Sequence, residues 1–234
     1  MQYITDLIAN IEEYPTRWPA SFPELRNEQG FWQLYEKVRP YSMVHATGFY
    51  NAYESINYLK EANIEGAIVE CGCFLGGMTA FMALVRNELR LAHPIYAFDT
   101  FEGFPEGSTD SFLGTPVGGP QYANFREAVQ ENILKVVGSL DRINLVQGRV
   151  EVTIPAMPLE NIALLRLDTD HYDSTIVELK HYYPRMALGG VLIVDDYGLY
   201  DGSRKATDEF LATLQRRPLL NRIDHAIWAG VKPG

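Results

Sequence analysis

The spacing of apolar residues along this chain changes repeatedly between helical and extended patterns. From residue 42 to residue 62, apolar side chains such as Phe49, Tyr53 and Ile56 recur at intervals of three or four. That spacing places them on one face, so we expect an α-helix with one buried side. We expect further helices over residues 77–91, 122–137, 174–187 and 204–215.

Short, nearly continuous apolar runs lie between these helices. The first is GAIVECG, residues 66–72, whose length and final glycine are typical of a buried parallel strand. Strands separated by helices need crossover connections, so we expect an α/β fold with a mostly parallel sheet and helices on both faces. Residues 220–231 predict two antiparallel strands at the sheet edge. The other predicted strands are residues 94–101, 142–148, 162–170 and 189–198.

Two segments do not follow this alternation. Residues 1–40 contain four prolines among several aromatic residues, which predicts short turns forming an N-terminal arm over apolar surface or a lid over a site. Residues 102–120 form a long loop rich in Gly, Ser, Thr and Pro, and loops of that length are often functional or mobile. Because no linker or repeat interrupts the rest, residues 41–234 are predicted to be one domain.

Charge, apolar content and cysteine count argue against a nucleic-acid-binding, membrane-spanning or secreted protein. The 234 residues include 20 Lys+Arg and 30 Asp+Glu, a formal net charge of −10, and 47% are apolar. An acidic balance argues against nucleic acid as a partner, since phosphate binding relies on clustered Lys and Arg. No apolar stretch approaches the roughly 20 residues of a membrane span, and the first residues carry acids rather than a secretory signal. The two cysteines, Cys71 and Cys73, are too close for a structural disulfide, so we expect a cytoplasmic protein.

The first candidate site is the segment ECGCFLGG, residues 70–77, between the first strand and the next helix. Glycines there let the backbone pass close to a ligand at the helix N-terminus. Phe74 replaces the second glycine of the dinucleotide fingerprint, and Glu70 would repel phosphates but attract a cation. S-adenosylmethionine, with an ammonium and a sulfonium, fits better, and Asp99 at the next strand end could accept its ribose hydroxyls. The alternative is that the glycines merely permit a tight turn.

The second candidate site is a set of carboxylates. Asp168 and the pair Asp195-Asp196 lie at the ends of consecutive predicted strands, which converge at one edge of a parallel sheet. Their mutual repulsion calls for protons or a cation, and oxygen ligands alone favour Mg²⁺, or else Mn²⁺ or Ca²⁺, over zinc. Alternatively, Asp168 could cap a helix and the pair could begin a solvated loop. Asp170 completes a D-x-D with Asp168, a pattern that also holds metal and sugar nucleotide in glycosyltransferases.

Together these motifs resemble the macrocin O-methyltransferase-type family of S-adenosylmethionine- and Mg²⁺-dependent sugar O-methyltransferases. The resemblance is carried by IVECGCFLGGMT at 68–79, FDTFEGFPE at 98–106, LLRLDTDHYDST at 164–175 and LGGVLIVDDYG at 188–198, with GSRKATDEF at 202–210 and the lead-in segment 39–56. It implies a class I methyltransferase (Rossmann-like) fold with a seven-stranded sheet and a C-terminal antiparallel hairpin. It implies Mg²⁺ on Asp168, Asp195 and Asp196. The implied cofactor contacts are Met43, Glu70, Gly72, Cys73, Gly76, Gly77, Asp99, Thr100, Phe101 and Gly148.

The resemblance also implies a reaction. Mg²⁺ would hold two adjacent oxygens of a small-molecule acceptor, a sugar of a natural-product glycoside, and Asp168 would accept the hydroxyl proton. Asp170 and His171 are alternative bases, and His225 is another. His171 and Ser203 stand where the family usually has other residues. We also expect a homo-oligomer, a dimer, with neither nucleic acid nor membrane as partner.

Three alternatives stay open at this point. A catechol-like phenol could be the acceptor, because the same metal chemistry serves an aromatic diol. A metal-dependent glycosyltransferase could use the Asp168/Asp170 pair. A non-catalytic protein could have kept the cofactor site, although the intact set of three acids argues against this.

Overall fold

The protein has a sheet of seven strands, five of them parallel. The computed structural model describes residues 28–105, 109–112, 115–119 and 121–234. The five parallel strands correspond to the five predicted from apolar runs, and the predicted C-terminal pair completes the sheet. The strands are β1 (Ala67–Cys71), β2 (Ile95–Asp99), β5 (Ile143–Gln147), β6 (Ile162–Leu167), β7 (Met186–Val194), β8 (Asn221–Arg222) and β9 (Trp228–Val231).

The strand order explains where a site can form. It runs β5-β2-β1-β6-β7-β9-β8, so the chain begins in the middle of the sheet and winds outward in both directions. The order reverses between β1 and β6, and ligands of such sheets bind beyond the strand carboxyl ends at this point. The antiparallel strand β9 pairs with β7 from Val194↔Trp228 to Val191↔Val231 and moves the sheet edge away from that point.

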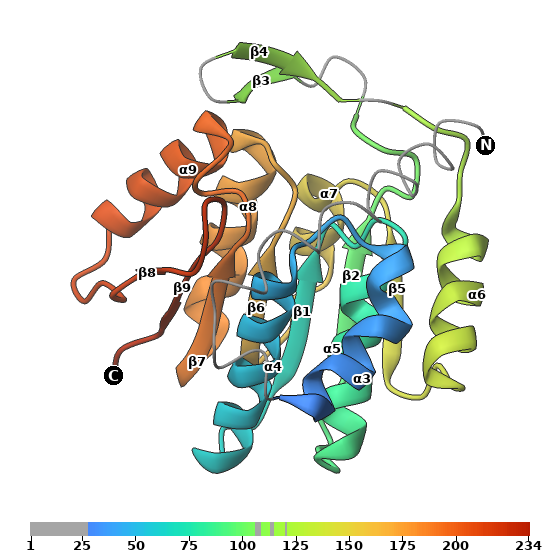
Figure 1. Ribbon diagram of the computed structural model, residues 1–234. Coiled ribbons are helices and arrows are strands. Elements are labelled where there is room, and N and C mark those ends of the chain that lie inside the picture. The colour runs from blue at the N-terminus through green and yellow to red at the C-terminus, as the bar shows by residue number, and fades with distance from the viewer. Residues whose placement is uncertain (1–27, 106–108, 113–114, 120) are drawn as a thin grey trace.

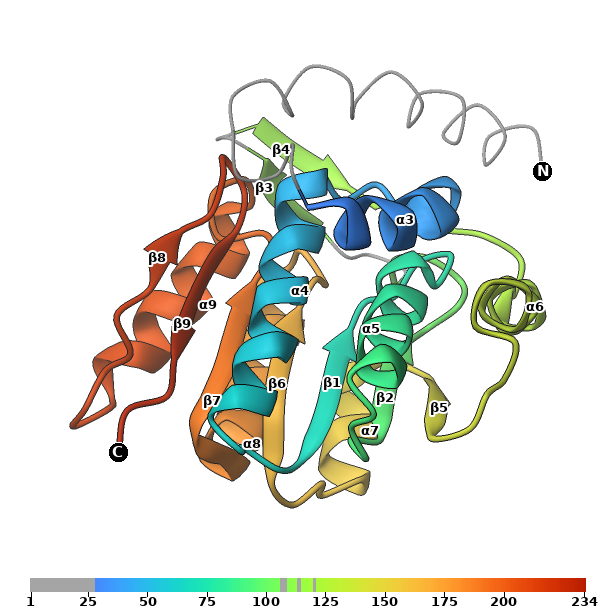
Figure 2. The ribbon, with the colours of Figure 1, turned by 60° about the horizontal axis from the view of Figure 1, so that its bottom comes forward.

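Helices cover both faces of the sheet (Figures 1 and 2). One face carries α3 (Gln29–Val38), α4 (Ala46–Glu61), α5 (Gly77–Glu88) and α6 (Arg126–Val137). The other carries α7 (Val150–Ala156), α8 (Tyr172–Tyr182) and α9 (Asp201–Ala212). No helix among the described residues is long and apolar enough to cross a membrane.

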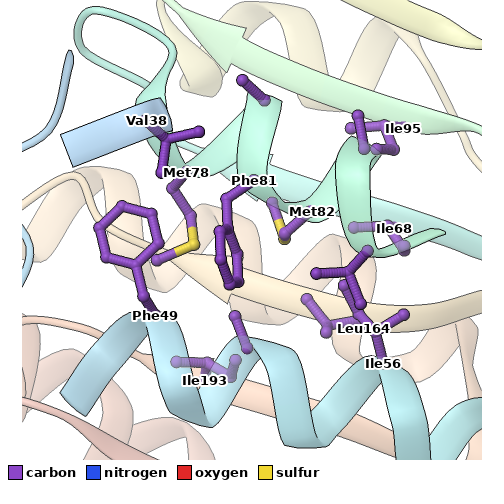
Figure 3. Close-up of a cluster of buried hydrophobic side chains, with 14 of the residues drawn as sticks. Val38, Phe49, Ile56, Ile68, Met78, Phe81, Met82, Ile95, Leu164 and Ile193 are labelled. Atoms are coloured by element: carbon purple, nitrogen blue, oxygen red, sulfur yellow. The ribbon is translucent and has the colours of Figure 1, made fainter. Parts of the chain in front are cut away.

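Alternation along the strands divides the core in two. Ile68 of β1 and Leu164 of β6 face the α4–α5 side, whereas their neighbours Val69 and Leu165 face the α8 side. Figure 3 shows part of the first core, where Phe81 of α5 lies among residues from the sheet, α3 and α4. Fully buried strands with apolar residues on both faces are what a parallel sheet covered by two helix layers requires.

The structure differs from the predicted turns in the N-terminal segment. Residues 29–38 form helix α3, and the short 3₁₀ helix Arg39–Tyr41 follows it. Phe31, Leu34 and Val38 recur at three- and four-residue spacing and are buried against α5. The prolines do not prevent this helix because none lies within it. Residues 1–27 of the predicted arm or lid lie outside the described residues.

Other differences concern boundaries and short elements. The helix predicted to residue 187 ends at Tyr182, followed by the 3₁₀ helix Tyr183–Arg185, and β7 begins at Met186. Helix α7 was not predicted; it has only seven residues and contains Pro155. The loop predicted at 102–120 contains a hairpin of β3 (Thr109–Phe112) and β4 (Thr115–Gly118). Such short elements have too few residues for their periodicity to show.

Candidate active site

The turn between β1 and α5 passes against the end of β6. Gly72 has a φ of 83°, and a Cβ on it would lie 1.8 Å from the Asp168 carbonyl oxygen. Gly76, with a φ of 84°, is the N-cap of α5, and a Cβ on Gly77 would lie 2.6 Å from the Tyr41 carbonyl oxygen. The turn therefore requires these glycines for conformation and close approach. Their predicted cofactor contacts remain predictions.

Asp99 fixes this turn through its carboxylate. Oδ2 accepts backbone N–H groups from Cys73 at 2.8 Å and Phe74 at 3.0 Å, and Oδ1 accepts that of Phe101 at 2.8 Å. Its backbone oxygen accepts the amide of Gly148, which joins the end of β5 to the same place. Burial raises the pKa of Asp99, while the three amides oppose the shift. Asp99 thus orders the predicted cofactor turn, and its role toward a ribose remains a prediction.

Arg166 is the charged centre of the site. It lies on β6 with only 1% of its side chain exposed, and it contacts three of the predicted acids. Its Nη1 lies 2.8 Å from Oε1 of Glu70, and its Nη2 lies 2.7 Å from Asp168 Oδ2 and 2.5 Å from Asp195 Oδ1. Burial lowers the pKa of the guanidinium, but the three carboxylates outweigh this and raise it well above its ordinary value. Arg166 therefore stays charged and offsets part of the acidic cluster.

Glu70 lies deeper than the other acids. It is fully buried and also accepts a hydrogen bond from the Thr79 hydroxyl of α5. Burial raises its pKa to about 7, against the lowering effect of Arg166. Glu70 thus connects β1, β6 and α5 beneath the turn, and its predicted contact with a cofactor remains a prediction.

The three predicted metal ligands come together. One oxygen each of Asp168, Asp195 and Asp196 lie within 4.8 Å of one another. Asp195 and Asp196 are buried, and Asp168 is half-buried. Burial and the surrounding carboxylates raise the pKa of Asp195 and Asp196 well above their ordinary value, although Arg166 lowers that of Asp195. The group carries more negative charge than Arg166 alone can balance, and its donor atoms suit a hard cation.

Asp170 lies beside this group rather than in it. Its backbone N–H donates to Asp196 Oδ2 at 3.0 Å, and its carboxyl hydrogen-bonds with Tyr200 and Asp196. Burial and the Asp168 charge raise its pKa to about 7. A carboxyl group with a pKa near neutrality can exchange a proton at the working pH of an enzyme.

The two histidines occupy different surroundings. His171 is buried at the N-cap of α8, with its ring 4.8 Å from that of Phe104 and 6.4 Å from that of Tyr200. Burial lowers its pKa, while Asp110 and two other nearby carboxylates oppose the shift. His225 is exposed, and its ring lies 5.0 Å from that of His45. Only His171 lies next to the D-x-D segment in sequence and also packs against Tyr200.

The remaining predicted cofactor residues differ in how far they are buried. Phe101 is fully buried in the core, and the Thr100 hydroxyl donates to the Gly103 carbonyl. Met43, 55% exposed, is the most exposed of this set. Cys71 and Cys73 are buried free thiols, and burial raises the pKa of both well above the ordinary value.

Asp110 of the hairpin also reaches this edge of the sheet. Its Oδ2 accepts the N–H of Tyr172 at 3.1 Å, and its Oδ1 accepts that of Gly202 at 3.0 Å. These amides lie in the first turns of α8 and α9, where backbone N–H groups lack helical partners and favour an anion. Asp110 therefore fastens β3 to the two segments that follow the predicted metal ligands.

Arg166, Asp110, Tyr200 and Thr169 were not among the predicted site residues. Arg166 gave a usable signal, because a single charged residue within an otherwise apolar buried strand must be paired. Asp110 gave none, because its contacts join residues 62 and 92 positions away in sequence.

Comparison with known proteins decides the family. A family model described as macrocin-O-methyltransferase (TylF) matches residues 25–230, most of the chain. The chain belongs to this family. It is an O-methyltransferase, and the resemblance seen in its motifs is confirmed. The glycosyltransferase and non-catalytic alternatives have no support from this result.

Curated relatives of this O-methyltransferase come from Streptomyces and Micromonospora species. Demethyldecarbamoylnovobiocin O-methyltransferase of Streptomyces niveus is 27% identical over 222 residues, covering 92% of this chain and 83% of the relative. Mycinamicin III 3''-O-methyltransferase of Micromonospora griseorubida is 27% identical over 199 residues, covering 82% and 77%. An 8-demethyl-8-(2,3-dimethoxy-α-L-rhamnosyl)-tetracenomycin-C 4'-O-methyltransferase of Streptomyces olivaceus is 28% identical over 188 residues, covering 72% and 68%.

Solved structures confirm the fold. The O-methyltransferase NovP superposes with a TM-score of 0.73 at 23% identity, covering 83% of each chain. The calicheamicin methyltransferase CalS11 superposes with a TM-score of 0.67 at 20% identity, covering 97% of this chain and 91% of the other. The predicted class I methyltransferase fold, with its seven-stranded sheet and antiparallel C-terminal pair, is thereby confirmed.

Proposed function

We propose that this enzyme is a Mg²⁺-dependent O-methyltransferase that moves a methyl group from S-adenosylmethionine to a sugar hydroxyl of a natural-product glycoside. The observation that carries the proposal is the convergence of Asp168, Asp195 and Asp196 at the carboxyl edge of the sheet. This cluster lies beside the glycine-rich turn, since Gly72 contacts the backbone of Asp168. The binding site of the methyl donor, at the turn, would then lie next to that of the methyl acceptor, at the acid cluster.

The cofactor would bind against the turn fixed by Asp99. Amides in the first turn of α5 lack helical partners and could face the cofactor, and Phe74 leaves less room than a glycine for a diphosphate. Glu70 and the nearby acids favour a cationic ligand over an anionic one. Met43, Thr100 and Gly148 are the further residues proposed to line this site.

The three clustered acids fit Mg²⁺. One oxygen of each is held by a protein donor: Arg166 holds Asp168 Oδ2 and Asp195 Oδ1, and the Asp170 amide holds Asp196 Oδ2. Each carboxylate is thus oriented and can offer its second oxygen to a cation. When bound there, Mg²⁺ would supply charge that favours ionisation of a hydroxyl held next to it.

We propose Asp170, rather than Asp168, as the base. Asp168 is paired with Arg166 at 2.7 Å and belongs to the proposed metal ligands, whereas Asp170 lies outside them with a pKa of about 7. Asp170 would take the proton of the acceptor hydroxyl, and S-adenosylmethionine, when bound, would supply the methyl group to that oxygen and leave as S-adenosylhomocysteine. Arg166 holds the acids in place, and His171 and Phe104 would form part of the wall beside the acceptor.

The acceptor class is drawn from the relatives. Their names include a rhamnosyl tetracenomycin, and a CalS11 structure is described as a TDP-rhamnose 3'-O-methyltransferase. A sugar with two neighbouring oxygens offers the chelating pair that a Mg²⁺ site can hold. We therefore propose a deoxysugar glycoside as acceptor for this chain.

The test offers a rhamnosyl glycoside with free vicinal hydroxyls and catechol side by side. Methyl transfer from labelled S-adenosylmethionine is measured with Mg²⁺ and with EDTA. We expect the glycoside to be methylated and EDTA to abolish the reaction. Methylation of catechol but not of the glycoside would show that the acceptor is a phenol. Full activity in EDTA would show that the reaction does not need the metal.

The role of Asp170 has its own test. Asp170→Asn keeps the size of the side chain but cannot accept the hydroxyl proton, so we expect kcat to fall about 100-fold or more. Since a cation nearby favours the ionised form, the acidic limb of the wild-type kcat profile should move to lower pH as Mg²⁺ is raised. Two results would return the role to Asp168. One is an acidic limb of the kcat profile that does not move with Mg²⁺, and the other is loss of that limb in Asp168→Asn but not in Asp170→Asn.

A further inference from the structure

Glu178 is a buried carboxyl group that the reaction does not use. It lies on α8, on the face packed against the sheet, and none of its surface is exposed. Burial raises its pKa to about 8, with further contributions from Glu151, Asp168 and Asp170. Burying a carboxyl group costs stability unless its hydrogen bonds are satisfied, yet Oε2 has no hydrogen-bond partner among the described residues. A position held at this cost needs a physical reason.

The partner of Glu178 is the middle residue of the D-x-D segment. The hydroxyl of Thr169 donates to Glu178 Oε1 at 2.9 Å. Thr169 stands between Asp168, a proposed metal ligand, and Asp170, the proposed base. Helix α8 therefore reaches back through Glu178 to the segment that precedes its own N-terminus.

That segment is a tight turn of unfavourable conformation. Asp170 has a φ of 65°, which is uncommon for a residue other than glycine. The N–H of His171 donates to the Thr169 carbonyl oxygen at 2.7 Å, which closes a three-residue turn around Asp170. Three-residue turns with a positive central φ are rare and strained, and such strain persists only where the surroundings hold it.

Thr169 is held on both its polar groups. Its carbonyl oxygen accepts His171 N–H and, at 3.4 Å, the hydroxyl of Ser174, while its own hydroxyl is held by Glu178. Its methyl group also lies near Gly72, since a Cβ on that glycine would lie 3.4 Å from Thr169 Cγ2. Among these contacts, the bond from the Thr169 hydroxyl is the one made to a fully buried side chain, that of Glu178.

We propose that Glu178 is a positioning residue for methyl transfer, which acts through the Thr169 hydroxyl to hold the strained turn that presents Asp168 and Asp170. The roles of those two acids rest on the proposed function, whereas the hold on the turn does not. Glu178 acts as a hydrogen-bond acceptor here, so its neutral form serves as well as its charged form.

Two variants remove the Thr169–Glu178 hydrogen bond at nearly constant side-chain volume, and two others keep it. Thr169→Val lacks the hydroxyl and Glu178→Leu lacks the acceptor. Thr169→Ser keeps the hydroxyl, and Glu178→Gln keeps a carbonyl oxygen at the same place. Thr207→Val is the matched control, because it removes a buried threonine hydroxyl that donates to a backbone oxygen of its own helix, α9.

The first measurement is hydrogen exchange at the His171 amide by NMR, which requires neither acceptor nor metal. We expect exchange to be about tenfold faster in Thr169→Val and Glu178→Leu, the factor for one lost hydrogen bond. We expect no change in Thr169→Ser, Glu178→Gln or the control. Unchanged His171 exchange in Thr169→Val overturns the proposal, even if Glu178→Leu proves too unstable to measure.

The second measurement is Mn²⁺ affinity, followed by electron paramagnetic resonance as a probe of the metal site. Loss of a residue that orients metal ligands typically costs 10- to 100-fold in affinity, so we expect about tenfold in both removing variants. Recovery by Thr169→Ser and Glu178→Gln supports positioning, and equal loss in those variants contradicts it. If the wild type does not bind Mn²⁺, the proposed metal site fails, and His171 exchange alone decides the role of Glu178.

Discussion

At the scale of single residues, one arginine determines how so many acids can share the site. Arg166 contacts Glu70, Asp168 and Asp195 within 2.8 Å and is almost fully buried. A buried ion pair is not by itself strong evidence of stability, because desolvation offsets the attraction. Removing only the arginine is different, because it leaves buried carboxylates without their partner.

We expect Arg166→Met to destabilise the fold by about 3–5 kcal/mol, the usual cost of leaving a buried charge unpaired. Urea denaturation followed by circular dichroism measures this. Arg149→Ala serves as the control, because Arg149 pairs with Glu151 at the surface, and such pairs contribute about 1 kcal/mol or less. Equal, small effects of the two substitutions would contradict the central role of Arg166.

A second residue-scale prediction concerns Asp196, which is buried and does not pair with Arg166 in the structure. Asp196→Asn removes one negative oxygen from the proposed metal site and keeps an oxygen to accept the Asp170 amide. We expect methyl transfer to fall about 1,000-fold, within the range for lost electrostatic stabilisation. Affinity for S-adenosylmethionine, measured by calorimetry, should change little. A parallel loss of cofactor affinity would instead indicate collapse of the whole site.

At the scale of elements, hairpin β3–β4 reaches the site through the carboxylate of Asp110. Asp110 accepts amides from the first turns of α8 and α9, and a Cβ on Gly202 would lie 1.7 Å from its Oδ2. Glycine at position 202 is thus needed for this contact. Figures 1 and 2 show the hairpin at the same end of the molecule as the start of α9.

We expect Asp110→Ala to release β3 from both helices while the sheet stays intact. Hydrogen exchange at the Tyr172 and Gly202 amides should accelerate about tenfold, since each loses its acceptor. Gly202→Ala should have the same effect from the other side of the contact, and Asp141→Ala, at an exposed loop position, should have none. Unchanged exchange in both Asp110→Ala and Gly202→Ala would contradict the contact.

At the scale of the whole molecule, the net charge of −10 is not spread over the surface alone. Glu70, Glu178, Asp195 and Asp196 are buried, and burial raises the pKa of each. A buried acid with a raised pKa binds its proton more tightly in the folded chain than in the unfolded chain. Its contribution to stability is therefore full below its unfolded pKa and is lost as the pH rises through the folded one.

For Glu178 this window runs from its ordinary value of 4.5 to about 8. We expect the free energy of unfolding of the metal-free protein to fall as the pH rises across this window. Glu178→Gln cannot titrate, so its stability should fall less steeply than that of the wild type. Urea denaturation at several pH values measures both slopes. Identical slopes would show that Glu178 is not protonated in the folded chain.

Much of the fold could be predicted because its signals are local. The five parallel strands were found because burial on both faces makes each of them a continuous apolar run. Helix α3 replaces the predicted turns because Phe31, Leu34 and Val38 carry the helical spacing and the neighbouring prolines lie outside the helix. The start of β7 at Met186 was missed because a 3₁₀ turn joins it directly to α8.

Local patterns in the sequence are enough to predict the sheet, the family and the three acids that gather at the strand ends. Parallel strands bring their carboxyl ends to one edge, so a strand-terminal acid is placed by topology alone. How these acids are held follows from the folded structure. Arg166 among them, Glu178 behind Thr169 and Asp110 across two helices depend on contacts between residues distant in sequence or hidden by burial. Such contacts depend on packing in three dimensions, which periodicity along one chain does not encode.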